Sequence, residues 1–200
     1  MTKRILVPIA NGTEEIEAVT IIDTLTRANY HVSVASADFD GKLTVTCSRG
    51  VVLTAQHRLV DIADEEFDAI VLPGGQAGAE VLQQSTLLVE MLRQQKYDGR
   101  LVAAICAAPA LVLQYHGLYP GAIMTGHPNF QEQIPASLRR TKRVTFDVTN
   151  NVLTSQGPGS SLEFAIEIII RLSGKTVAKQ IAEPMMVLPQ LHYDKLSEDA

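Results

Sequence analysis

Short runs of apolar residues recur along the chain, and segments with helical periodicity separate them. Continuous apolar runs of about four to eight residues are typical of buried parallel strands. Pro8 lacks the N–H that a sheet requires, so it indicates the last residues of the first strand or an edge of the sheet. The pattern predicts strands at Arg4–Ala10, Tyr30–Ala37, Phe67–Leu72, Leu101–Ile105, Ala122–Thr125, Val144–Asp147 and Val152–Ser155.

Apolar residues spaced three and four positions apart predict two long helices. The first spans Glu14–Ala28, and the last begins at Ser160 and ends at Gly174. Ser160 and Glu163 have the spacing of a capping box. The two apolar stripes are Ala18, Ile21, Ile22 and Leu25, and Leu162, Ala165, Ile166 and Ile169. Shorter helices are predicted to start near Ser85, Pro109 and Thr176.

Two further segments have a distinctive composition. Leu43–Cys47 and Val51–Thr54 are short β-like segments on either side of Ser48–Gly50, which predicts a hairpin or flap. Cys47, in an alternating strand, is interpreted as a packing residue. The basic run Arg139–Arg143 is interpreted as a solvated helix end rather than a nucleic-acid patch.

Strands that alternate with helices indicate a parallel sheet with helices on both faces. We therefore expect a single α/β domain with a flavodoxin-like, doubly wound, mostly parallel sheet. It would occupy residues 1–200, with a core from about 3 to 183 and a tail from about 184 to 200. Ligands of such folds bind beyond the carboxyl ends of the strands. Four segments fall there: Asn11–Glu17, Pro73–Gly78, Cys106 and Gly126–Pro128.

Composition narrows the range of functions. A net charge of −5 makes nucleic acid an unlikely primary partner. Two cysteines make neither a disulfide framework nor a zinc site, and reduced thiols suit the cytoplasm, which is the expected location. No signal-peptide pattern is present, and the longest uncharged apolar run, Leu101–Leu113, is too short for a membrane span of about 20 residues.

Cys106 has the most distinctive position in the chain, because it falls between a predicted strand and a helix opened by Pro109. Free backbone N–H groups and the helix dipole at such a junction favour a thiolate, which we expect at neutral pH. The alternative is a buried cysteine that only fills the core, since free cysteine is among the most buried residue types. This stretch alone leaves both interpretations open.

The other candidate residues are also ambiguous by themselves. Glu14, Glu15 and Glu17 can each simply favour the start of a helix, and periodicity does not single one out. The glycines after Leu72 fit either a tight turn or a loop whose N–H groups approach a ligand. His127 follows a predicted strand end, although most loop histidines are ordinary surface residues.

Five motifs taken together identify a resemblance. The chain resembles the DJ-one/ThiJ/PfpI superfamily, on the branch of bacterial YajL and a human parkinsonism-associated deglycase. The motifs follow the family's order and cover nearly the whole chain. They are Asn11–Glu17, Cys47–Gly50, Val71–Gly75, Ala103–Pro109 and Leu153–Gly159.

The resemblance implies roles that the residues alone do not establish. Cys106 would be the oxidation-prone nucleophile at a strained elbow, and Glu17 would be the acid that hydrogen-bonds its sulfur. We expect Glu17 to be protonated at rest, because a second anion beside a thiolate is unfavourable. The loop N–H groups facing the sulfur or an oxyanion would be those of Gly74, Gly75 and Ala107.

Further implied roles concern the rim of the pocket and a partner subunit. His127 would be an auxiliary pocket histidine. Arg27 and Arg49 would lie near the sulfur at the interface of a homodimer, to which the partner would contribute Pro158. Gln156 stands where the human relative has arginine, which puts any role of that charge in doubt.

Three functions follow from the resemblance. The first is a glutathione-independent glyoxalase and protein deglycase that acts on small reactive aldehydes such as methylglyoxal, without a metal or organic cofactor. The second is a non-enzymatic redox-sensing chaperone that responds through oxidation of Cys106. Glycated or unfolded proteins are the expected protein partners of these functions. The third, an amidase or protease of the PfpI type, is disfavoured because Ala107 rather than histidine follows Cys106 and no His-x-Glu occurs.

Overall fold

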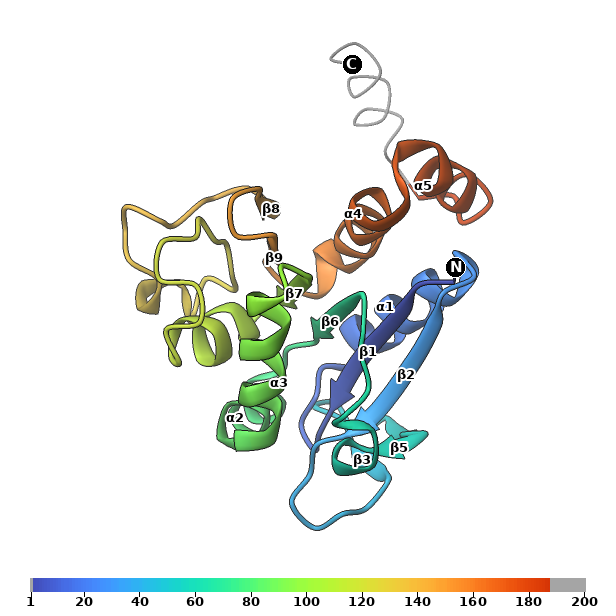
Figure 1. Ribbon diagram of the computed structural model, residues 1–200, viewed down its shortest axis with the longest axis vertical. Coiled ribbons are helices and arrows are strands. Elements are labelled where there is room, and N and C mark those ends of the chain that lie inside the picture. Colours follow the sequence, from blue (N-terminus) through green and yellow to red (C-terminus); the bar gives the residue numbers. More distant parts are fainter. Residues whose placement is uncertain (1, 188–200) are drawn as a thin grey trace.

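The computed structural model describes residues 2–187 and contains a seven-stranded sheet in the order β5-β2-β1-β6-β7-β9-β8 (Figure 1). Strand pairs are parallel except for β8 with β9, which is antiparallel. This is the doubly wound, flavodoxin-like sheet that the sequence predicts. The strands are β1 (Arg4–Ile9), β2 (His31–Ser36), β5 (His57–Arg58), β6 (Ala69–Leu72), β7 (Leu101–Ile105), β8 (Val144–Asp147) and β9 (Val152–Ser155).

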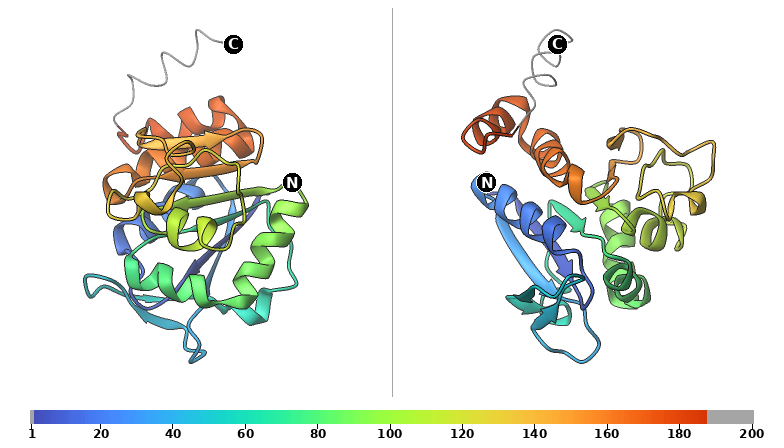
Figure 2. Two further views of the ribbon diagram at one scale, coloured as in Figure 1. Left: turned by 90° about the vertical axis from the view of Figure 1, so that its left-hand side faces the viewer. Right: turned by 180° about the vertical axis from the view of Figure 1, so that it is seen from behind.

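Helices cover both faces of the sheet (Figure 2). One face packs against α1 (Glu15–Arg27), α4 (Ser161–Ser173) and α5 (Lys175–Ala182). The other packs against α2 (Gln76–Gln84), α3 (Thr86–Tyr97) and the π-helical segment Pro109–Gln114. None of the helices within residues 2–187 has the length and apolar character that crossing a bilayer requires.

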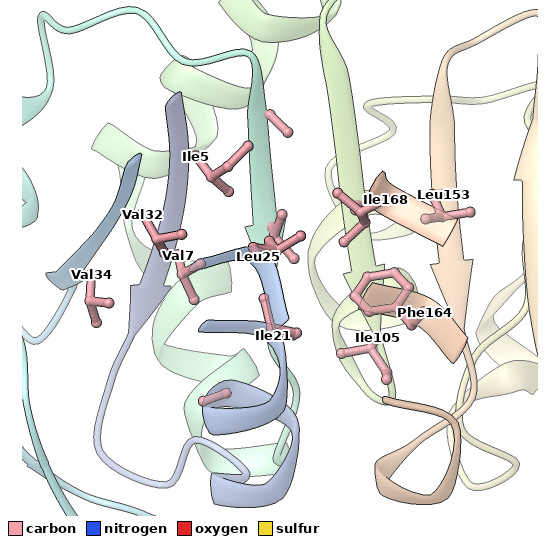
Figure 3. Packing of buried hydrophobic residues seen from close by; sticks show 14 of the residues in the cluster. Ile5, Val7, Ile21, Leu25, Val32, Val34, Ile105, Leu153, Phe164 and Ile168 are labelled. Carbon is pink, nitrogen blue, oxygen red and sulfur yellow. The ribbon is translucent and has the colours of Figure 1, made fainter. Parts of the chain in front are cut away.

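The face under α1 and α4 shows why the apolar stripes point inward. In Figure 3, Ile21 and Leu25 of α1 lie against Val7 of β1, and Phe164 and Ile168 of α4 lie near Ile105. All six side chains are fully buried. Each such burial removes apolar surface from water and stabilises the fold by about 1.5–3 kcal/mol. The two helices are therefore fixed on the sheet beside the end of β7.

Several local predictions need correction. Ala122–Thr125 is not a strand: it contributes only an isolated bridge between Met124 and Arg139. The basic run Arg139–Arg143 is a loop before β8 and not a helix end. In this loop Arg139 pairs with Glu132, and Arg143 pairs with Glu163.

The start of α4 also differs from its prediction. Ser160 Oγ bonds to Gly157 and to Ser155 Oγ, so it does not cap the helix, and Glu163 is occupied by Arg143. Leu162 is exposed, and the inward-facing residues are Phe164, Ala165, Ile166, Ile168 and Ile169.

Two other predictions fit the structure. The flap is a hairpin of β3 (Thr44–Thr46) and β4 (Val52–Thr54). Pro8 is the penultimate residue of β1, where pairing with β6 has already ended, so its missing N–H breaks no ladder on that side. The expected tail from residue 184 lies mostly outside the described residues.

Candidate active site

Cys106 follows the last residue of β7 with φ +65°, a left-handed conformation that is uncommon for a non-glycine residue. Its backbone is held on both sides: the N–H donates to Ser155 O at 3.0 Å, and its carbonyl accepts from the His127 N–H at 2.8 Å. The residue is only 7% exposed. The strand-to-helix elbow predicted for the sulfur is therefore present.

The helix α1 brings Glu17 to this elbow. Glu17 is completely buried because it shares the inward face of the helix with Ile21 and Leu25, one and two turns further on. Its Oε2 accepts the Gly74 N–H at 2.7 Å. Oε1 is buried and accepts no hydrogen bond of standard geometry within the described chain, and the Cys106 thiol is the side chain that approaches the carboxyl.

Gly74 lies between the two side chains. A Cβ on Gly74 would lie 2.5 Å from the Cβ of Cys106 and 2.8 Å from Glu17 Oε2, so no larger residue fits. The resemblance implied that its N–H faces the sulfur or an oxyanion, but that N–H is already donated to Glu17. The backbone groups that approach the thiol are those of Gly75 and Ala107.

Burial dominates the electrostatics of the pair. It raises the pKa of the Glu17 carboxyl from its usual value to about 7; the Gly74 N–H and the thiol oppose this shift, and the charge of Glu14 adds to it. Glu17 is thus divided between its two protonation states at neutral pH.

Burial first, and then the Glu17 carboxylate, raise the pKa of the Cys106 thiol; the N–H groups of Gly75 and Ala107 oppose them, and the net result is a pKa of about 12. Burial and the carboxylate both favour the protonated thiol, so the surroundings of Cys106 within this chain do not support the expected thiolate. The sulfur is too deeply buried, and it faces a carboxyl instead of a cation.

The arginines expected near the sulfur do not reach it within this chain. Arg27, at the end of α1, pairs with Asp23 at 2.7 Å and is exposed. It lies ten residues beyond Glu17, or about 15 Å along the helix. Arg49, in the flap, is also exposed; its charge acts on Glu14. Neither residue supplies a positive charge beside the thiol here.

His127 is positioned beside the elbow by its own backbone bond to Cys106 O. Its ring is partly buried, and Nδ1 accepts the Asn129 N–H at 3.2 Å, so a neutral ring has its proton on Nε2. A Cβ on Gly157 would lie 3.5 Å from the His127 ring, which places the loop before α4 next to it. Pro158 is partly buried in this loop. The side-chain amide of Gln156 donates a hydrogen bond to Thr141 O.

Glu14 and Glu15, which the sequence suggested could favour the start of the helix, both make specific hydrogen bonds. Glu14 is the helix N-cap, and its Oε2 accepts the Glu17 N–H at 2.8 Å. Glu15 is buried and accepts from Ser48 Oγ and the Arg49 N–H, both at 2.8 Å, so it fastens the flap to the helix. The Glu-x-x-Glu spacing of 14 and 17 was the available signal for the cap.

Cys47, at the base of the flap, is buried in the core, and burial raises its pKa. This position agrees with its interpretation as a packing residue.

Two surface hollows, of about 320 and 240 Å³, are lined by residues other than Cys106 and Glu17. Among residues 2–187, no three His, Cys, Asp or Glu side chains are grouped so that they could hold a metal ion.

Comparison with known proteins shows to which family this chain belongs. A model of the DJ-1/PfpI family matches residues 3–171. The chain belongs to the DJ-1/PfpI family. Protein dj-1beta of Drosophila melanogaster is a full-length relative, 37% identical over 94% of this chain and 98% of its own. The family resemblance drawn from the five motifs is thus confirmed.

Other family members differ in length and name. DJ-1 homolog A of Arabidopsis thaliana is 40% identical over 94% of this chain, and the chain spans about half the length of the Arabidopsis relatives, 47% of this one. A Caenorhabditis elegans relative named glutathione-independent glyoxalase DJR-1.2 is 29% identical over 86% of this chain and 89% of its own.

Solved structures of the family confirm the fold. The structure of Toxoplasma gondii DJ-1, described as oxidized, is 43% identical, has a TM-score of 0.90 and covers 94% of this chain and 100% of its own. Drosophila DJ-1beta has a TM-score of 0.87, again over 94% of this chain and 99% of its own.

Proposed function

We propose that this protein is a glutathione-independent glyoxalase that converts 2-oxoaldehydes such as methylglyoxal to 2-hydroxy acids. The observation that carries the proposal is the buried Glu17 carboxyl against the Cys106 thiol. A group with a pKa of about 7 can accept and return protons at physiological pH. The name of the C. elegans relative supports the same activity.

The chemistry follows from the positions of these groups. The sulfur attacks the aldehyde carbon and forms an S–C bond, while its proton passes to ionised Glu17 and from there to the carbonyl oxygen. Glu17 then removes the proton on that carbon and returns it to the neighbouring carbon, while the hydroxyl proton of the hemithioacetal moves to the former ketone oxygen. The aldehyde carbon is thereby oxidised to a thioester and the ketone is reduced to an alcohol. Water cleaves the thioester, which releases lactate and the thiol.

Backbone groups stabilise the charge that develops during these steps. The N–H groups of Gly75 and Ala107 approach the sulfur, so they are placed to serve an oxygen on the carbon attached to it. Gly74 contributes differently, because its N–H orients Glu17. His127 lies at the edge of the elbow as an auxiliary donor through Nε2.

A homodimer is part of the proposal. Exposed apolar side chains lie on two connected elements: Ile16 and Val19 on α1, and Val51 and Val52 at the flap. Glu15 fastens these elements together, so the side chains belong to one region of the surface. A twofold contact there would cover them. By the resemblance to the family, the partner's Arg27, Arg49 and Pro158 would then lie near the site. A monomer in sedimentation at micromolar concentration contradicts this part.

Lactate formation from methylglyoxal without glutathione tests the activity. Cys106→Ser and Glu17→Gln should each lower kcat/KM by at least about 10²-fold, because each removes a group that takes part in proton or group transfer. Cys47→Ala, which changes the other buried thiol, is the matched control and should retain the parent rate. Turnover by Glu17→Gln at the parent rate would refute the acid/base role.

A second candidate is a redox-sensing chaperone, and the oxidized Toxoplasma relative favours it. Oxidation of Cys106 by two equivalents of a peroxide, each of which transfers one oxygen atom, would give a sulfinate. This anion would lie against protonated Glu17, which could donate a hydrogen bond to it. Deglycase activity, unfolded or glycated protein partners and a cytoplasmic location remain predictions of the same kind. In one purified sample, holdase activity that depends on Cys106 while methylglyoxal turnover is absent would favour this candidate over the enzyme.

A further inference from the structure

Glu14, Gly74 and Glu17 form a closed ring of three hydrogen bonds. The Glu14 N–H donates to Gly74 O at 3.0 Å, and the Gly74 N–H donates to Glu17 Oε2 at 2.7 Å. The Glu17 N–H completes the ring by donating to Glu14 Oε2 at 2.8 Å. The ring therefore connects the first turn of α1 with the loop that follows β6.

This ring is a variant of the capping box, in which Gly74 is inserted between the N-cap residue and the residue three positions later. In a capping box, the side chain three residues after the N-cap bonds back to the N-cap N–H. Here Gly74 stands between the two: its carbonyl accepts from the N-cap N–H, and its own N–H donates to the Glu17 carboxyl. Both backbone groups are satisfied, and the Glu17 carboxyl is displaced from the helix towards Cys106.

The ring has little freedom to change its shape. A Cβ on Gly74 would meet Cys106, Glu17 and the carbonyl of Ile105, so this peptide is enclosed on all these sides. Glu17 itself is fully buried. Glu14 is the one carboxyl of the ring that is partly exposed, and its carbonyl also accepts the Ala18 N–H of the helix.

The charged groups around the ring are few. Cys106 and Glu14 face Glu17, and the charge of Glu14 disfavours ionisation of Glu17. Glu14 is in turn faced by Glu15 from the same turn and by Arg49 from the flap. Glu14 thus acts on Glu17 in two ways, through the hydrogen-bonded ring and through its charge.

We propose that Glu14 is a positioning residue for the Cys106–Glu17 pair: its carboxylate and peptide N–H close the ring with Gly74 that fixes the Glu17 carboxyl against the thiol. The proposal concerns the reactivity of the thiol itself. Its consequence for aldehyde conversion rests on the proposed function.

The pH dependence of Cys106 alkylation by iodoacetamide tests this in a Cys47→Ala background. Glu14→Gln retains an oxygen for the Glu17 N–H but removes the charge, so the inflection that reports Glu17 should move down by about half a pH unit with an unchanged Tm. Glu14→Ala opens the ring, so the inflection should disappear and the rate at pH 7 should fall about tenfold. Glu90→Gln, an equal charge change on α3, should leave the profile unchanged.

The outcomes separate positioning from simple helix capping. If Glu14→Ala lowers Tm while both variants retain the parent's pH profile, Glu14 only caps α1 and the proposal is overturned. If Glu14→Ala does not fold, the Glu14→Gln profile decides, because that variant keeps the cap. Alkylation requires no substrate turnover, so absence of lactate formation in the parent protein would refute the proposed function and leave this test valid.

Discussion

Strands β6 and β7 lie side by side, and each is followed by a residue with positive φ at the start of a helical segment. After β6 this residue is Gly75, with φ +83°; after β7 it is Cys106, with φ +65°. Glycine adopts this conformation freely, whereas a residue with a Cβ loses about 1 kcal/mol or more. The first turn is therefore relaxed and tightly enclosed, and the second is strained and has a reactive side chain.

The two turns are complementary parts of one candidate site. Gly75 must be glycine because a Cβ would lie 2.6 Å from Glu14 N and still closer to Gly12 O. The positive φ at position 106 favours glycine, but the residue there is cysteine. A strained conformation that is retained in this way indicates that the thiol side chain itself is needed at this position. The strained backbone of Cys106 thus lies beside a tightly packed turn that accepts only glycine.

The largest effect should come from crowding the relaxed turn. Gly75→Ala adds both an unfavourable φ and a clash with backbone atoms, so we expect a loss of about 4 kcal/mol in unfolding free energy. Gly50→Ala is the matched control, since Gly50 also has positive φ but has no atom within 4 Å of the added Cβ. It should lose only about 1 kcal/mol. Equal losses in urea denaturation would show that packing at Gly75 contributes nothing.

A smaller effect concerns the proton beside the strained turn. The pKa of Glu17 is raised to about 7 in the folded protein, so the folded state holds its proton more tightly than the unfolded state. The tighter binding of this proton contributes fully to the free energy of unfolding below about pH 4.5, the pKa of Glu17 in the unfolded chain. The contribution is lost as the pH rises through about 7. The parent should therefore lose roughly 3 kcal/mol between pH 4.5 and 8 that Glu17→Gln does not lose. Parallel stability curves for the two proteins would contradict the raised pKa.

The smallest effect measures the strain directly. At most buried positions alanine is more stabilising than glycine, because glycine loses more backbone freedom on folding. At position 106 we expect the reverse order, with Cys106→Gly more stable than Cys106→Ala by about 1 kcal/mol in urea denaturation. The control is position 107, which lies outside the left-handed region: there the parent protein, with Ala107, should be more stable than Ala107→Gly. If alanine is also favoured at position 106, the elbow is not strained.

The sequence was sufficient for most of the fold, because the apolar runs are strong signals. The helix α2 was missed: Gln76–Gln84 contains Gly78 and several polar residues, and it follows two glycines that favour a turn. Ala122–Thr125 has the composition of a strand, but its backbone is largely satisfied in other ways, such as the Thr125 N–H bond to Thr154 Oγ1.

The site could be predicted only in part, since its function depends on contacts between distant segments. Periodicity allowed Glu14 or Glu17 to face inward, and only packing against Gly74 distinguishes them. The helix start favoured a thiolate at Cys106, but the depth of burial, which no local pattern encodes, raises its pKa instead. Arg27 was assigned by resemblance, and a single chain gives it no contact with the sulfur.

The two backbone bonds of Cys106, to Ser155 and from His127, have a consequence for what the fold can become. They hold the peptide on either side of the residue without using its side chain. The backbone conformation at position 106 is thus set by the surrounding strands and loops, and it does not depend on which nucleophilic side chain the residue has. Chemistry at this position is separable from architecture, so a serine, a selenocysteine or an unnatural thiol would inherit the same orientation towards Glu17 without redesign of the sheet.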